Sequence, residues 1–198
     1  MVAMNNSSLK KCEMLFDFYE LAQSAGFLAN GSGNTVAWFD MFYRPSKDLG
    51  GFCIMAGIQQ FVEYIENLSF SEDEIEFLRQ KGLSEDFLNY LASFKFECDV
   101  WAVPEGTPIF ANEPIVKVRG PIIQAQLLET IILQSINHQS LIATKANRIV
   151  RAAQGREVIE FGARRAHGIS SAMNGARSAY IGGFCATTNV GASQTFSI

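Results

Sequence analysis

The stretch EVIEFGARRAHGISSAMNGARSAYIGGFCATTN, residues 157–189, decides the fold of this chain. Its pattern predicts a short strand over residues 157–162, a helix rich in Ala, Gly and Ser over 164–181, and a second short strand over 183–186. Small residues let a helix pack closely on a sheet, and strand, helix and strand in this order are typical of a parallel β/α structure.

The residues before this stretch predict a different mixture of elements. Between about residues 34 and 120 the pattern is that of an α+β domain, with a strand at 35–43, a helix at 52–68, short helices opened by Ser71 and Ser84, and short strands from 96 to 120. A helix is also expected at 13–28. No Gly or Pro interrupts residues 122–154, which predicts a long helix over 121–155, broken near 137–140.

The composition is that of a folded protein. The chain has 198 residues, of which 48% are apolar and 18% charged. No apolar run is long enough for a membrane-spanning helix, and residues 1–14 lack the apolar stretch of a signal peptide, so we expect no membrane partner. Four scattered cysteines and two histidines give neither a zinc motif nor a disulfide framework, which favours a reduced, cytoplasmic setting.

Charge is distributed unevenly along the chain. Residues 1–140 hold nine Lys and Arg against 18 Asp and Glu, whereas residues 141–198 hold seven against two. An excess of cations in the last part suggests that it meets anions, although arginines on solvated helix faces would give the same count. Nucleic acid is not expected, because aromatic residues do not interleave with the basic ones and no DNA-binding motif is present. Phosphorylated small molecules fit better.

The two predicted strand ends carry the best candidates for a binding site, because ligands of parallel β/α folds bind at the carboxyl ends of strands. The first end, residues 161–165, offers an aromatic ring at Phe161 and guanidinium groups at Arg164 and Arg165. The second, residues 186–189, offers hydroxyl and amide groups, including Thr188 and Asn189, at a predicted helix start. An arginine pair at a strand end is often structural, but matching chemistry at two successive ends favours a site for a flat anion. No phosphate loop, dinucleotide fingerprint or Ser-His-Asp arrangement competes with it.

Short motifs lie in order along almost the whole chain: DFY at 17–19, FDMFYR at 39–44, GGF at 50–52, PEG at 104–106, QLLET at 126–130, NHQSLIATKANR at 137–148, FGARRAHG at 161–168 and YIGGFCATTNV at 180–190. Together they resemble nicotinate phosphoribosyltransferases, of the type II phosphoribosyltransferase class. The resemblance implies an enzyme, a glycosyltransferase and ATP-coupled ligase of NAD salvage. It would transfer the phosphoribosyl group of phosphoribosyl pyrophosphate to the ring nitrogen of nicotinate, giving nicotinate mononucleotide and pyrophosphate.

The same resemblance implies cofactors, partners and site residues. ATP is hydrolysed as a co-substrate, and Mg²⁺ holds the pyrophosphate. Arg164 matches the catalytic arginine near the nicotinate carboxylate, and Phe161 stands where a relative places a stacking ring. Thr188 and Asn189 fall in the same pocket. Family members are homodimers, and Tyr19 stands at the position of a tyrosine that the partner subunit lends to the site.

The resemblance also fixes the expected fold class, α/β. An α+β N-terminal domain over residues 1–138, with a linking helix from 121, precedes the first strands of an incomplete, irregular α/β barrel over 139–198. The family's Gly-Thr-x-Ala-His-Ser stretch, whose histidine is phosphorylated, and the rest of the barrel are not found in these 198 residues. Phe16 and His167 also stand where the family usually has Thr and Gln.

We therefore expect an N-terminal fragment that makes no nicotinate mononucleotide by itself. Two other interpretations stay open at this point. The chain would be a non-catalytic subunit or interaction module completed by a separate chain, or a relative of the nicotinamide and quinolinate phosphoribosyltransferases.

Overall fold

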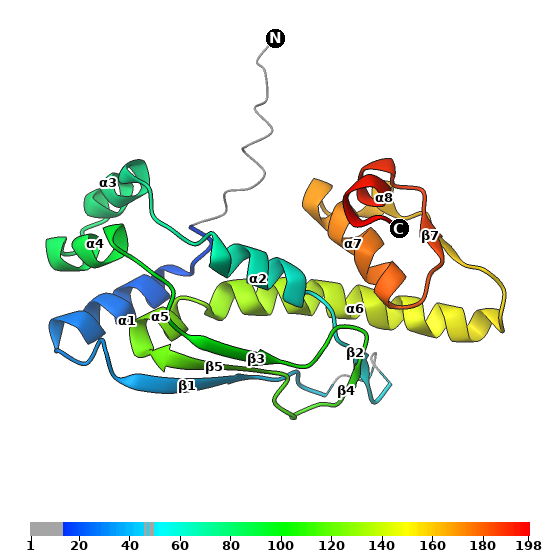
Figure 1. Ribbon diagram of the computed structural model, residues 1–198, viewed down its shortest axis with the longest axis horizontal. Helices are drawn as coiled ribbons and strands as arrows, with labels where there is room; N and C mark the ends of the chain where they lie inside the picture. The colour runs from blue at the N-terminus through cyan, green and yellow to red at the C-terminus, as the bar shows by residue number, and fades with distance from the viewer. Residues whose placement is uncertain (1–13, 46, 48–49) are drawn as a thin grey trace, which may run out of the picture. The chain divides into compact units, whose positions relative to one another are not determined.

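A computed structural model describes residues 14–45, 47 and 50–198 of the chain (Figure 1). The prediction that residues 1–14 contain no signal peptide falls almost entirely outside the described residues. So does part of the loop that precedes the GGF motif. The described elements combine helices with short strands, which confirms the α/β class. They divide into two compact units: the first holds Met1–Phe39, Val62–Asp99 and Val118–Ile131, and the second holds Asp40–Phe61, Val100–Lys117 and Ile132–Ile198.

The first unit is built around apolar faces of short helices. These are α1 (Phe18–Ala29), α3 (Glu72–Gln80), α4 (Glu85–Ala92) and α5 (Ile122–Gln126). Each contributes side chains to one buried cluster, and Phe16 stacks on Phe70 at its border with 5.7 Å between ring centroids. The cluster consists of Leu21, Phe70, Ile75, Leu78, Phe87, Leu88, Leu91, Ile123 and Leu127.

Two helix starts in this unit confirm the sequence prediction. Ser71 caps α3 in a full capping box: its hydroxyl accepts from the Glu74 amide, and the Glu74 carboxylate accepts from the Ser71 amide at 2.7 Å. Ser84 stands at the same position of α4, but its side chain makes no capping bond. The Ser-x-x-Glu spacing therefore identified the more strongly capped helix.

A three-stranded sheet contains β1 (Val36–Met41), β5 (Val116–Pro121) and β3 (Asp99–Ala102), in that order (Figure 1). Along β5 the side chains alternate, with Val116 and Val118 buried and Lys117 and Arg119 exposed, as in a strand with one solvated face. Gly120 is required by packing, because a Cβ there would overlap Cys98.

The second unit holds two pairs of very short strands. β2 (Cys53–Ile54) pairs antiparallel with β4 (Pro108–Ile109), and β6 (Ile159–Glu160) pairs parallel with β7 (Ala186–Thr187). Between β6 and β7 the chain forms a 3₁₀ turn (Ala163–Arg165) and α7 (Ile169–Ile181), and after β7 it forms α8 (Val190–Phe196). The parallel strand–helix–strand order predicted from residues 157–189 is thus confirmed. The helix expected over 164–181, however, begins only at Ile169, and the strand expected over 183–186 lies at Ala186–Thr187.

Long-helix predictions needed two corrections. The helix expected at 52–68 begins only at Ile58, as α2 (Ile58–Glu66), because residues 53–54 form β2 and Gly57 adopts a φ of 105° that suits glycine. The break expected near 137–140 is absent: α6 (Glu129–Ala153) runs straight through, and the interruption comes earlier, after α5 (Figure 1). Within α6, the Ser140 hydroxyl donates to the Ala56 carbonyl and accepts from the Ala56 amide, both at 3.1 Å.

The predicted boundary between residues 138 and 139 falls inside α6. The two units, in contrast, alternate along the chain, and α2, α6, β1, β3 and β5 each have residues in both. The assignment of domains to 1–138 and 139–198 stays a prediction.

Candidate functional site

The carboxyl ends of β6 and β7 lie next to each other in the second unit. Glu160 pairs with Thr187 in the parallel register, and the Thr188 amide donates to the Glu160 carbonyl oxygen at 3.0 Å, one step past the strand. The two polar segments singled out from the sequence therefore emerge at one edge. The segment of Phe161 and Arg164 and the segment of Thr188 and Asn189 therefore follow neighbouring strand ends, and a shared binding site for the four residues stays a prediction.

The first segment presents an aromatic ring and a cation. Phe161 is 60% exposed, and the Arg164 guanidinium carbon lies over its ring, 5.2 Å from the centroid. Arg164 and Arg165 belong to the 3₁₀ turn, and both are exposed. A guanidinium held on an aromatic face keeps its outer edge available, and that edge can bind a carboxylate with two hydrogen bonds.

The second segment is largely engaged with its own backbone. Asn189 caps α8, since its Oδ1 accepts from the Ala192 amide at 3.1 Å, and its Nδ2 donates to the Ala172 carbonyl at 3.5 Å. α8 has only seven residues, so the helix start expected to bind anions is short and already capped. Thr188 is exposed beside it. Direct contacts of Thr188 and Asn189 with a substrate stay a prediction.

Glu160 and Thr187 are part of this edge, and sequence reasoning did not select them. The Glu160 carboxylate accepts from the Gly162 amide and, at 2.6 Å, from the Thr187 hydroxyl. In the sequence, Glu160 is one of two acidic residues in the basic stretch 141–198, which also holds seven Lys and Arg. The signal that could have identified it is its place as the last strand residue before Phe-Gly, where a side chain reaches the strand end.

Tyr19 lies in the first unit, on α1, and is 43% exposed. Its hydroxyl hydrogen-bonds to Glu129, and this bond, with burial and the negative charge of Glu129, raises the pKa of Tyr19 to about 12. The Glu129 carboxylate also accepts from the Gln126 side chain at 3.2 Å. Tyr19 thus belongs to a different unit from the other four candidate residues.

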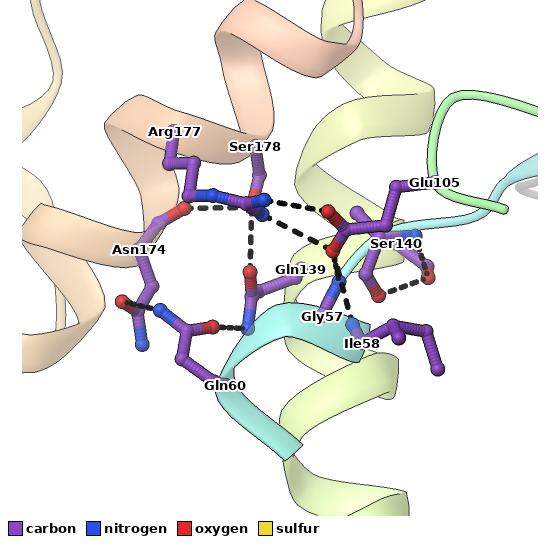
Figure 2. Close-up of polar contacts among 10 residues, drawn as sticks. Gly57, Ile58, Gln60, Glu105, Gln139, Ser140, Asn174, Arg177 and Ser178 are labelled. Atoms are coloured by element: carbon purple, nitrogen blue, oxygen red, sulfur yellow. Dashed lines mark hydrogen bonds and ion pairs between the residues drawn. The ribbon is translucent and has the colours of Figure 1, made fainter. Parts of the chain in front are cut away.

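A polar cluster in the second unit explains where one of the basic residues is used. Figure 2 shows the Glu105 carboxylate at the start of α2, where it accepts from the Gly57 amide at 2.6 Å and the Ile58 amide at 3.0 Å. The Arg177 guanidinium of α7 donates to both oxygens of the same carboxylate, at 3.1 and 2.5 Å. Both side chains are largely buried. Arg177 is therefore paired, and it is not one of the cations offered to an anion.

The cluster extends along α7 through neutral side chains (Figure 2). The Gln139 amide donates to Gln60, and the Gln60 amide donates to Asn174. Ser178 donates to the Asn174 carbonyl at 2.6 Å and approaches the Gln139 side-chain oxygen at 3.5 Å. These bonds connect α7, the helix between the two strand ends, to α2 and α6.

Residues 14–45, 47 and 50–198 contain no group of three or more His, Cys, Asp or Glu side chains placed to hold a metal ion. At the strand ends the one carboxylate, that of Glu160, already accepts two hydrogen bonds. We derive no step through Mg²⁺. None of the helices in the described part of the chain is long and apolar enough to cross a membrane.

The chain is thus an α/β protein in which two neighbouring strand ends carry an exposed aromatic ring, exposed arginines and hydroxyl and amide groups. A family profile described as the nicotinate phosphoribosyltransferase (NAPRTase) N-terminal domain matches residues 14–137. The chain belongs to the nicotinate phosphoribosyltransferase family.

Similar proteins agree with this assignment. The chain is 43% identical over 183 residues to nicotinate phosphoribosyltransferase pncB2 of Mycobacterium tuberculosis, covering 92% of this chain and 39% of that protein. It is 39% identical to the nicotinate phosphoribosyltransferase of Bacillus subtilis, over 92% of this chain and 37% of that protein. The chain thus spans about two fifths of the length of the curated relatives it matches.

Two solved structures resemble this chain in fold, and the first is also similar in sequence. The crystal structure of human nicotinic acid phosphoribosyltransferase aligns with a TM-score of 0.85 and 30% identity, covering 91% of this chain and 37% of that chain. The nicotinate-nucleotide pyrophosphorylase of Pyrococcus furiosus aligns with a TM-score of 0.69 at 21% identity, which is a likeness of fold alone.

Proposed function

We propose that this chain supplies the nicotinate-binding strand ends of a nicotinate phosphoribosyltransferase. The observation that carries the proposal is the edge where β6 and β7 end, with the Arg164 guanidinium over the exposed Phe161 ring and Thr188 and Asn189 alongside. Family membership and the names of the relatives support it.

The reaction is a displacement at C1 of the ribose. The lone pair of the pyridine nitrogen forms the new N–C1 bond, the C1–O bond to pyrophosphate breaks, and its electron pair leaves on the pyrophosphate oxygen. The ring nitrogen becomes positively charged. Since the departing group leaves positive charge on the sugar carbon, the protein acts mainly by positioning and by electrostatics.

Each candidate residue has a role in this scheme. Arg164 binds the nicotinate carboxylate through the outer edge of its guanidinium and so sets the direction of the ring nitrogen. Phe161 supports that guanidinium and the apolar face of the base, and the segment of Thr188 and Asn189 borders the pocket. In a homodimer, Tyr19 of one protomer covers the ring bound to its partner.

The remaining features implied by the family resemblance belong to the same proposal. They are coupled ATP hydrolysis, Mg²⁺ accompanying the pyrophosphate, a role in NAD salvage as glycosyltransferase and ligase, and a cytoplasmic location. The pyrophosphate carries several negative charges, which a divalent cation neutralises when bound.

A chimera tests the proposal in a full-length setting. The part of this chain that matches the Mycobacterium tuberculosis relative replaces the corresponding segment of that protein, and formation of nicotinate mononucleotide is measured from nicotinate and phosphoribosyl pyrophosphate. We expect activity with nicotinate in preference to nicotinamide and quinolinate. Arg164→Ala should lower kcat/KM for nicotinate about a hundredfold, because a bidentate charge-assisted contact is lost.

The matched control is Arg156→Ala, which removes an exposed arginine between α6 and β6 and should stay within about twofold of the parent. An active chimera that is indifferent to Arg164→Ala, or that prefers another base, would contradict the proposal. If the chimera does not fold, as judged by circular dichroism, equilibrium dialysis of nicotinate against the 198-residue chain and its Arg164→Ala variant decides the same point.

A further inference from the structure

One carboxylate joins the two strand ends. Glu160 is the last residue of β6, and its side chain folds back so that one oxygen accepts from the Gly162 amide while the other accepts from the Thr187 hydroxyl at 2.6 Å. Its carbonyl oxygen also accepts from the Thr188 amide at 3.0 Å. Backbone and side chain of the same residue therefore hold β6 to the end of β7.

On the β6 side, this bond shapes the turn that carries Phe161 and Arg164. Phe161 lies between Glu160 and Gly162, so its backbone is fixed from both sides. A Cβ at position 162 would lie 2.9 Å from the Glu160 carboxylate, which explains why a glycine accepts this contact. The Arg165 amide then donates to the Gly162 carbonyl at 2.8 Å and starts the 3₁₀ turn.

On the β7 side, the same carboxylate orders residues 187–189. The Thr187 hydroxyl donates its hydrogen to Glu160 and accepts from the Asn189 amide at 3.0 Å. Asn189 in turn caps α8. A continuous chain of hydrogen bonds therefore runs from the Gly162 amide to the start of α8.

We propose that Glu160 is a positioning residue, which fixes the Phe161–Arg164 turn against the end of β7 so that the guanidinium meets the ligand in one orientation. The identity of the ligand, nicotinate, rests on the proposed function; the positioning itself does not. A carboxylate is needed because both oxygens accept at once. A glutamine offers one acceptor and one donor, and an aspartate is one methylene shorter.

Electrostatics alone predicts the opposite effect on binding. A negative charge beside the site repels an anionic base, so neutralising Glu160 would strengthen binding if charge were its main influence. Positioning predicts that Glu160→Gln weakens binding although repulsion is removed. The sign of this one change separates the two roles.

The first measurement needs no ligand. In ¹H–¹⁵N spectra of the 198-residue chain at about pH 7, the Gly162 amide proton should move upfield in Glu160→Gln, because a neutral acceptor makes a weaker hydrogen bond than a charged one. It should keep the parent's position in Glu157→Gln, which neutralises an exposed carboxyl group on the same segment. A Gly162 amide at the same position in all three proteins would overturn the proposal.

The second measurement is the dissociation constant of nicotinate by equilibrium dialysis. Glu160→Gln, Glu160→Asp and Thr187→Val should each weaken binding about tenfold, the effect of one charge-assisted hydrogen bond, while Glu157→Gln leaves it unchanged. Equal or tighter binding by Glu160→Gln together with unaltered binding by Thr187→Val would refute positioning. Should the Glu160 variants unfold, Thr187→Val, which preserves side-chain volume, carries the test.

The two failures can be told apart. If the parent chain binds no nicotinate but the Gly162 amide shifts in Glu160→Gln, the ligand assignment is wrong and the positioning of the turn holds. If nicotinate binds and the Gly162 amide is indifferent to Glu160, the ligand assignment holds and the positioning role is refuted.

Discussion

Glu20 is a carboxyl group in the core of the first unit. Glu20 is fully buried. Its Oε1 accepts from the Thr130 amide at 3.1 Å and from the Thr130 hydroxyl at 2.5 Å. Its Oε2 has no hydrogen-bond partner within the described ranges, and neither has the buried Ser24 hydroxyl one helical turn later. Burial raises the pKa of Glu20, and the bonds from Thr130 offset only part of that effect.

The raised pKa of Glu20 makes stability depend on pH with a definite sign. The folded chain holds the Glu20 proton more tightly than the unfolded chain does. The contribution of protonated Glu20 to the free energy of unfolding is therefore complete below the unfolded pKa of about 4.3, and it is lost as the pH rises through the folded pKa. Glu20→Gln should therefore raise the free energy of unfolding at about pH 7.5 by about 1 kcal/mol and have less effect near pH 4. Gln keeps the acceptor for Thr130 and places an amide donor where Oε2 was unpaired.

Urea denaturation at both pH values measures this difference. Glu66→Gln, the same change at the exposed last residue of α2, should leave the dependence as it is in the parent. A Glu20→Gln variant less stable than the parent at about pH 7.5 would show that the ionised carboxylate has a stabilising partner.

At the scale of elements, the starts of α3 and α4 form a matched pair. Both begin after a serine in extended conformation, but only the Ser71 hydroxyl accepts a bond from its helix. Ser71→Ala should lower the free energy of unfolding by about 1 kcal/mol, the usual effect of a lost N-cap, whereas Ser84→Ala should change it by less than about 0.5 kcal/mol. Urea titrations of the two variants decide the matter, and equal losses at both serines would mean that the capping box does not set the stability of α3.

The same pair shows which elements the sequence could predict. A capping box is local, so four residues reveal it, and the parallel β6–α7–β7 unit follows from periodicity within about thirty residues. The start of α2 is not local. Residues 53–54 pair with 108–109, and this pairing, which no neighbouring residue signals, replaces the first turn of the expected helix with a strand. The Ser140 hydroxyl of α6 likewise bonds to the backbone of Ala56, far away in the sequence.

At the scale of the whole molecule, each unit is assembled from three separate stretches of chain. This explains which parts of the site were predictable. The segments of Phe161 and Arg164 and of Thr188 and Asn189 lie at one edge because parallel strands end there, a rule that needs no long-range contact. The partner of Arg177 is Glu105, 72 positions earlier, and a count of charges could not assign it.

The Glu105–Arg177 pair joins two of the stretches that make up the second unit, and with the Gly57 and Ile58 amides it joins all three. Burial alone would raise the pKa of Glu105, but the hydrogen bonds and charge of Arg177, together with the backbone amides, outweigh it and lower that pKa. The stabilising contribution is therefore present above the unfolded pKa of about 4.3 and is lost as the pH falls through the lowered value.

Glu105→Gln should lower the free energy of unfolding at neutral pH by about 3 kcal/mol, because it leaves the largely buried Arg177 guanidinium without its counter-charge. The loss should become smaller as the pH falls through the lowered pKa of Glu105, because the parent carboxyl group is then itself protonated. Glu113→Gln, at an exposed carboxyl group in the same stretch, serves as the control and should be nearly neutral. Replacing both partners, as Glu105→Gln with Arg177→Met, should cost less than Glu105→Gln alone, since no unpaired charge remains. A double variant as unstable as the sum of the two single variants would show that the two side chains stabilise the second unit independently and not as a pair.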